Sequence, residues 1–267
     1  MKKLFTLLVL TISFSMNAQL TAVTEGGNTG QRLSTSNASN HGDIGSNAVD
    51  LSYSSISGIP FGATGDYSTA MGHQTTASGD GSTAMGYATA ASGTFSTAMG
   101  QGAIANGNYS TAIGNYSVAS GASSTAIGNI VTASGSVSTA MGNRTTASDY
   151  ASTVIGQYNS SGSSVTNNAT SFSTSNTAFV IGNGADSSNK SDAFKVMFNG
   201  DATLAGSMTA TSFIGDGSQL TNLPSSGADS PFSYNSNEAG GIEVANYTTA
   251  SGSRAFAVGN DNLASGS

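Results

Sequence analysis

Several things that most folded proteins contain are scarce in this chain. It has no cysteine and no tryptophan, and only 8% of its 267 residues are charged. Without cysteine the chain can form no disulfide, so its stability has to come from stacking of repeated units or from oligomerisation. Its two histidines, His41 and His73, fall in unrelated sequence contexts, and each is expected to be a solvated surface residue.

Sequence signatures of catalysis and of ligand chemistry are missing as well. The patterns G-x-x-x-x-G-K, H-E-x-x-H and G-x-S-x-G do not occur in a fitting context. Asp66 and Asp80 take equivalent positions in successive repeats, but the next copies carry Thr94 and Asn108, so no aspartate ladder for calcium continues. We therefore predict a non-enzymatic protein with no catalytic residue, no metal and no cofactor.

The N-terminus is typical of a secretory signal peptide. Residues 1–18 combine two lysines with a short apolar run, and a small residue precedes the expected cleavage point between Ala18 and Gln19. The run is too short for a transmembrane helix. Cleavage leaves five Lys and Arg against fourteen Asp and Glu, a net charge of −9. Such an acidic chain is not expected to bind nucleic acid or an anionic lipid surface.

A fourteen-residue repeat, G-x-x-S-T-A-[M/I]-G-x-x-x-x-A-S, runs from Gly65 to Gly156, and its seventh copy has Asp149 in place of the first glycine. A short fixed period is the mark of a solenoid, in which each coil packs only against its neighbours. Low-complexity composition can also indicate disorder, but disorder does not require an apolar residue at one position of every copy. The predicted turn residues are Gly65, Gly72, Gly79, Gly86, Gly93, Gly100, Gly107, Gly114, Gly121, Gly128, Gly135, Gly142 and Gly156.

Each copy holds two short segments that favour strands over helices, 68–71 and 75–78 in the first copy. A coil of fourteen residues has a narrow interior, so the small Ala70 and Ala77 columns are expected inside and the Met/Ile column outside. An apolar stripe along a whole rod exceeds what a monomer normally exposes, which predicts a subunit interface. That column is Met71, Met85, Met99, Ile113, Ile127, Met141 and Ile155.

The rest of the chain divides by composition. Glycines at a seven-residue spacing return near the C-terminus at Gly252, Gly259 and Gly266, so we expect the chain to be a fragment whose second roll continues beyond Ser267. The predicted divisions are a signal peptide (1–18), an N-terminal cap or leader (19–64), a β-roll (65–159), an insertion with a degenerate half-coil (160–191), a β connector (192–224), a linker (225–246) and the start of a second roll (247–267).

Two segments carry a specific family resemblance. The sequences from Ser110 to Gly121 and from Ala255 to Asn260 closely resemble the head repeats of YadA-like trimeric autotransporter adhesins. The resemblance implies an all-β, left-handed parallel β-roll or solenoid, packed side by side as a homotrimer. It also implies a secreted protein displayed at the cell surface or outer membrane of a bacterium. There it would bind a host or environmental surface ligand, with membrane attachment only through a C-terminal anchor that this chain does not contain.

Two other functions stay open at the level of sequence. Residues 193–224 resemble connector modules of bacterial surface fibres and phage-tail-like fibres, which implies a structural spacer with a C-terminal anchor or an endosialidase-type chaperone elsewhere. The Thr69 column, one threonine per coil, is typical of ice-binding solenoids. The residues two positions earlier, such as Tyr67 and Phe95, are not threonine, so the double row of such proteins does not form.

The missing ligand clusters generate a first prediction. Treatment with a strong chelator should leave the thermal melt of the protein unchanged, because no set of side chains was found that could hold a structural metal. Circular dichroism melts with and without chelator provide the measurement, and a clear fall in melting temperature would contradict it.

Overall fold

The computed structural model describes residues 20–209 and 211, together with five short strands between residues 232 and 265. The predicted signal peptide and its cleavage site at Ala18 and Gln19 lie outside these described residues. So do residues 212–224 of the predicted connector and most of the predicted linker and second roll. Residues 1–208 and 209–267 form two compact units.

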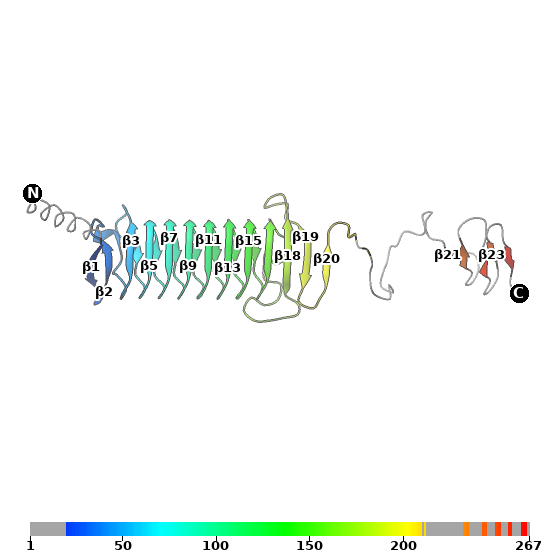
Figure 1. The fold of residues 1–267 in the computed structure, drawn as a ribbon, viewed down its shortest axis with the longest axis horizontal. Helices are drawn as coiled ribbons and strands as arrows, with labels where there is room; N and C mark the ends of the chain where they lie inside the picture. The colour runs from blue at the N-terminus through cyan, green and yellow to red at the C-terminus, as the bar shows by residue number, and fades with distance from the viewer. Residues whose placement is uncertain are drawn as a thin grey trace, which may run out of the picture. The chain divides into compact units, whose positions relative to one another are not determined.

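The first unit is a parallel β-solenoid, which confirms the predicted all-β fold class (Figure 1). Each coil adds one five-residue strand to a long sheet, and equivalent residues pair in register, as Thr111 does with Thr125. The fourteen-residue period therefore sets the register of the whole stack. The strands are β3 (Val49–Tyr53), β5 (Thr69–His73), β7 (Thr83–Tyr87), β9 (Thr97–Gln101), β11 (Thr111–Asn115), β13 (Thr125–Asn129), β15 (Thr139–Asn143) and β17 (Thr153–Gln157).

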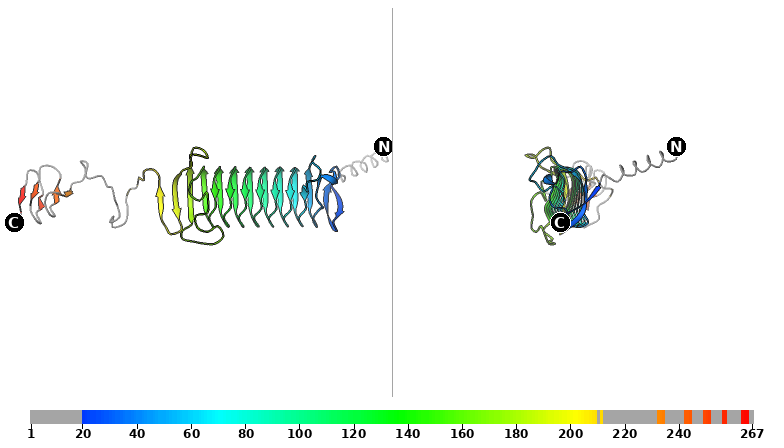
Figure 2. Two further views of the ribbon diagram at one scale, coloured as in Figure 1. Left: turned by 180° about the vertical axis from the view of Figure 1, so that it is seen from behind. Right: turned by 90° about the vertical axis from the view of Figure 1, so that its left-hand side faces the viewer.

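A second, narrower sheet closes each coil, and Figure 2 shows the stack from behind and along its length. The apolar core between the two sheets consists mainly of alanine, with buried serine and threonine columns beside it, and Ala70 and Ala77 are completely buried, as predicted. A coil of this length has room mainly for small side chains. The short strands are β4 (Gly62–Ala63), β6 (Thr76–Ala77), β8 (Ala90–Ala91), β10 (Ile104–Ala105), β12 (Val118–Ala119), β14 (Thr132–Ala133) and β16 (Thr146–Ala147).

Two columns of glycine allow the coils to stack. The column of Gly65 lies in a bend before each turn, and a Cβ atom there would overlap with the backbone of the next coil. The column of Gly72 lies inside the long strands rather than in a turn, which differs from the predicted arrangement. Gly72 has a φ of +120°, a conformation that side chains rarely adopt, and the chain turns only at Gln74.

Residues other than glycine take left-handed conformations at the corners of the coil. Tyr67, Phe95 and Tyr109 have φ between 55° and 60°, a conformation that costs about 1–2 kcal/mol for an ordinary residue. Each corner amide donates a hydrogen bond to the preceding coil, as the Phe95 amide does to the Asp80 carbonyl at 2.8 Å. The Phe95 ring also covers Gly81 of the previous corner, where a Cβ would lie 2.5 Å from the ring. Inter-coil contacts therefore hold these corners.

An N-terminal cap covers the first coil. The antiparallel strands β1 (Leu20–Glu25) and β2 (Asn28–Leu33) are followed by a 3-10 turn, η1 (Ala38–Asn40), and β2 pairs in parallel with β3. The cap places a carboxylate inside the roll, because Asp50 pairs in register with Ala70 of the core column. A buried charge of this kind requires partners.

The partners of Asp50 come from the cap and from β3. Arg32 donates from Nε to the Asp50 carboxylate at 3.1 Å, and the His41 Nδ1 lies 2.9 Å from the same oxygen. Ser52 donates from its hydroxyl and its amide to the other oxygen. The expectation that His41 is solvated is wrong, because its side chain is only 1% exposed in this network. His73 is half-buried and packs between the rings of Tyr53 and Tyr87.

The regular coil breaks after β17. Residues 160–176 form a loop, and the chain then returns as β18 (Thr177–Asn183), which continues the long sheet in parallel register. Two strands follow in antiparallel order, β19 (Asp192–Met197) and β20 (Ala202–Leu204). Their connection carries the dipeptide Asn199-Gly200, typical of a tight turn, with Gly200 at a φ of +95°.

At this break, side chains make hydrogen bonds that the backbone of a further coil would otherwise make. Asp149 stands in the first glycine column, and its buried carboxylate accepts hydrogen bonds from the amides of Thr166 and Thr177 at 2.6 and 2.8 Å. The Asn159 amide pairs with both the N–H and the carbonyl of Thr146, as a further short strand would. Asp149 can carry a side chain because no regular coil packs against it there.

The second unit contains β21 (Phe232–Tyr234), β22 (Ile242–Val244), β23 (Thr249–Ser251), β24 (Phe256–Ala257) and β25 (Leu263–Ser265). β21 and β22 are antiparallel. β22 pairs in parallel with β24, and β23 with β25, and in both pairs the register offset is fourteen residues, the same as in the roll.

The glycine columns generate a second prediction. Gly114→Ala should destabilise the roll by at least about 2 kcal/mol, since its φ of +123° is unfavourable and its new Cβ would overlap with the Gly128 carbonyl. Gly206→Ala is the matched control, because open space surrounds that position, and it should change stability by less than about 0.5 kcal/mol. Urea unfolding followed by circular dichroism measures both, and equal stabilities would refute the proposed role of the column.

The cap generates a third prediction. Burial raises the pKa of Asp50, but hydrogen bonds from His41 and Ser52 outweigh that effect and hold the pKa below its usual 3.8. A lowered folded-state pKa stabilises the protein above pH 3.8, and this stabilisation is lost as pH falls through the folded-state value. The free energy of unfolding of Asp50→Asn should therefore be lower than that of the wild type at pH 7, by about 1–3 kcal/mol.

The difference in the free energy of unfolding between wild type and Asp50→Asn should become smaller as the pH falls below 3.8. Urea unfolding at pH 7, 5 and 3 provides the measurement, and the exposed Asp43→Asn is the control. A difference that stays constant from pH 7 to pH 3 would contradict the ionised, hydrogen-bonded state of Asp50.

Candidate functional site

The outer face of the long sheet presents three parallel columns of side chains. Strand alternation turns the alanine of each coil inward and three neighbouring positions outward, represented by Thr69, Met71 and His73 in β5. Because the strands pair in register, each position lines up with its equivalent in every coil. The face is therefore a regular pattern rather than a single site.

The central column of this face is the predicted Met/Ile column. Met71, Ile127 and Met141 are 37–39% exposed, and the other four members of the predicted column are partly exposed. The pairing register adds Leu51 before Met71 and Ile181 after Ile155. We call these nine residues the apolar stripe: Leu51, Met71, Met85, Met99, Ile113, Ile127, Met141, Ile155 and Ile181.

The fourteen-residue motif does not include the two end members. Leu51 lies in V-D-L-S-Y and Ile181 in F-V-I-G-N, both of which match the strand pattern only in part. Aligning them with T-A-[M/I]-G-x could have found both. With neighbouring strands about 4.8 Å apart, nine rungs make a stripe roughly 38 Å long.

The third column changes in chemistry along the roll. It begins with the stacked rings of Tyr53, His73 and Tyr87 and continues as amide side chains. The exposed amides of Asn115 and Asn129 each donate to the next member of the column at 2.7 Å. Ring stacking and an amide ladder thus connect successive coils on the surface.

Reactive chemistry is sparse in the part of the chain that the structure describes. Within residues 20–209 and 211, no group of three or more histidine, cysteine, aspartate or glutamate side chains could hold a metal ion. The ion pairs of this region all involve Arg32 or His41 of the cap. No helix in the same region is long and apolar enough to cross a bilayer.

The class of protein follows from this geometry. A parallel solenoid with an alanine core and repeated outer columns is an extended scaffold that presents surfaces. The model of the YadA head domain repeat matches residues 63–89, 91–117, 105–129 and 133–159. These coils are therefore YadA-like head repeats, as their motif predicted. No curated protein matches the chain significantly.

This repeat belongs to adhesins of the trimeric autotransporter type, which are exposed at the cell surface and are not enzymes. The family in general assembles as trimers. Residues 63–159 of this chain thus carry repeats of the type found in such adhesin heads.

Proposed function

We propose that this chain forms the head of a secreted, surface-displayed adhesin, and that three copies of its roll pack in parallel through the apolar stripe. The observation that carries the proposal is the unbroken stripe itself. Nine Met, Ile and Leu side chains in one line make an apolar surface larger than soluble monomers usually expose. A homotrimer gives this surface a partner, and the family supports that number of subunits.

The composition of the core supports the same assembly. The interior holds mainly alanine, serine and threonine, so a single roll buries few large apolar side chains. Completing the burial of one Met or Ile side chain would stabilise the assembly by up to about 1.5–3 kcal/mol. Several such side chains in each of three copies provide a strong driving force for association, even if each contributes only part of that value.

Adhesion in this arrangement is multivalent. Three rolls would present the same uncharged hydroxyl and amide side chains many times along a rigid stack. Weak contacts at repeated sites add up when they are linked, so the assembly gains avidity without one deep pocket. The ligand is a host or environmental surface, and the mechanism requires no catalytic step.

Ice binding gains no comparable support from the structure. The Thr69 column is a single row beside the apolar stripe, and the outward positions of the short strands mix Thr76 with Ala90 and Ile104. A regular double row of threonines is therefore absent from the described coils.

The stripe generates a fourth prediction. Met99→Asp should shift the protein from trimer towards monomer, because three aspartates would face one another in a dry interface. Sedimentation equilibrium measures the subunit number, and circular dichroism should show that the β-structure is largely kept. The control is Ser123→Asp, a substitution at an exposed corner away from the stripe, which should remain trimeric.

The same variants test adhesion. Beads coated with Met99→Asp should attach to extracellular matrix at least about a hundredfold more weakly than beads coated with wild type or Ser123→Asp, because avidity is lost. A monomeric wild type would overturn the trimer. A Met99→Asp variant that unfolds completely would show instead that this side chain is part of the core of its own roll.

A further inference from the structure

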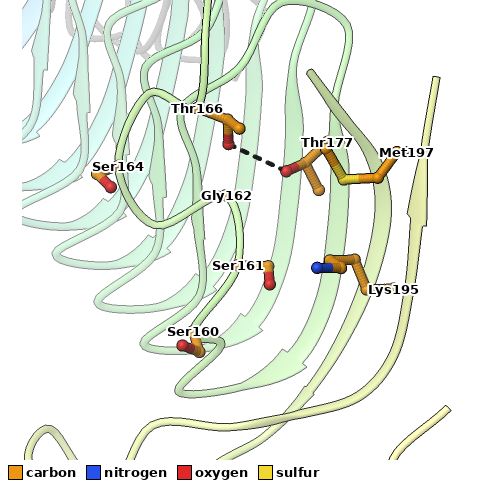
Figure 3. Close-up of a pocket in the computed structure, with 8 residues that line it drawn as sticks. All are labelled: Ser160, Ser161, Gly162, Ser164, Thr166, Thr177, Lys195 and Met197. Atoms are coloured by element: carbon orange, nitrogen blue, oxygen red, sulfur yellow. Dashed lines mark hydrogen bonds between the residues drawn. The ribbon is translucent and has the colours of Figure 1, made fainter. Parts of the chain in front are cut away.

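A hollow lies at the end of the roll, between the loop of residues 160–176 and strands β18 and β19. It has a volume of about 350 Å³, and hydroxyl side chains from the loop and from β18 line it (Figure 3). Figure 3 shows the Lys195 side chain entering from β19, with its ammonium group directed toward the loop that carries Ser161. The hollow therefore combines one cation with several hydroxyl groups.

The break in the coil pattern explains why the hollow exists. The short-strand sheet stops at β16, where the Asn159 side chain satisfies Thr146 in place of another strand. The inner face of β18 and β19 is consequently covered by the loop instead of by a short strand. Lys195 pairs directly with the buried Val180, so its side chain leaves the sheet on the inner face, opposite to the apolar stripe.

The lysine has no acidic partner there. Among residues 20–209 and 211, no carboxylate lies within ion-pair distance of Lys195. The nearest acid along its own strand, Asp192, is held by the amides of Ser160 and Ser161, each at 2.8 Å. A partly buried cation without a counter-ion is a favourable position for an anion, even in a chain with a net charge of −7.

The hydroxyl groups around Lys195 are also available. Thr166 and Thr177 contact each other at 3.2 Å, and each hydroxyl keeps capacity for a further hydrogen bond. In the part of the chain that the structure describes, no hydrogen bond from the hydroxyls of Ser160, Ser161 or Ser164 is found. Hydroxyls near a cation suit a ligand that carries both an acidic group and many hydroxyls of its own.

We propose that this hollow binds an acidic sugar, with a carboxylate or sulfate group on the Lys195 ammonium and sugar hydroxyls on the serine and threonine side chains. The volume falls at the lower end of the range for small-molecule sites, which fits one or two sugar rings. This inference rests on the proposed adhesive function and names its ligand class. Since the hollow lies on the opposite side of the sheet from the apolar stripe, a trimer formed through the stripe leaves it open.

The test is ligand-observed NMR and calorimetry on the full chain. The probes are sialyllactose for a carboxylate, galactose 6-sulfate for a sulfate, and lactose as the neutral control. We expect binding of at least one acidic probe, weakening with added salt, and no binding of lactose. Lys195→Gln should weaken that binding at least tenfold, whereas Lys190→Gln, which removes a neighbouring exposed lysine, should leave it unchanged.

Several results would overturn the inference. One is that neither acidic probe binds, and another is that lactose binds as tightly as the acidic probes. A third is that Lys195→Gln and Lys190→Gln change the binding of an acidic probe equally. Subunit number and bead attachment, measured on the same samples, separate this inference from the proposed function. If the protein is a trimer that adheres but does not bind acidic sugars, only the proposed sugar site is refuted. If it is a monomer that binds acidic sugars through Lys195, only the proposed trimer is refuted.

Discussion

Close stacking of one backbone on the next is the constraint on which the whole roll depends. At the columns of Gly65 and Gly72, a coil lies so near its neighbour that even a Cβ atom would overlap with a carbonyl group. This approach aligns the parallel ladders and lets corner amides, such as that of Tyr67, bond to the preceding coil. Left-handed corners that would be unfavourable in an isolated chain are stable here because each is held by the coil beside it.

The size of the coil then decides where apolar side chains can lie. Two sheets joined by such short turns enclose space for alanine, so larger residues such as Met71 lie on the outer face. The roll thereby has a small internal core and a long external stripe, which is the reverse of an ordinary globular domain. Association through the outer face, as proposed, would supply the burial that the interior cannot.

Buried charged side chains occur where the regular stacking of coils ends. Asp50 enters the core column at the first coil because the cap supplies Arg32 and His41 as partners. At the other end, Asp149 occupies a glycine column and fixes the loop that replaces the next coil. In the described part of the roll, the buried carboxylates of Asp50 and Asp149 therefore lie near its two ends.

The sequence by itself determined the solenoid, the buried alanines and the outward Met/Ile column, because a local repeat places every copy in the same environment. It did not determine that the chain turns at Gln74 rather than Gly72, since an ordinary residue accepts that conformation only when the next coil holds it. Nor did it determine the buried side chain of His41 or the hollow at Lys195. Those environments arise from non-repeating residues distant in the chain, so only the tertiary structure could bring their partners together.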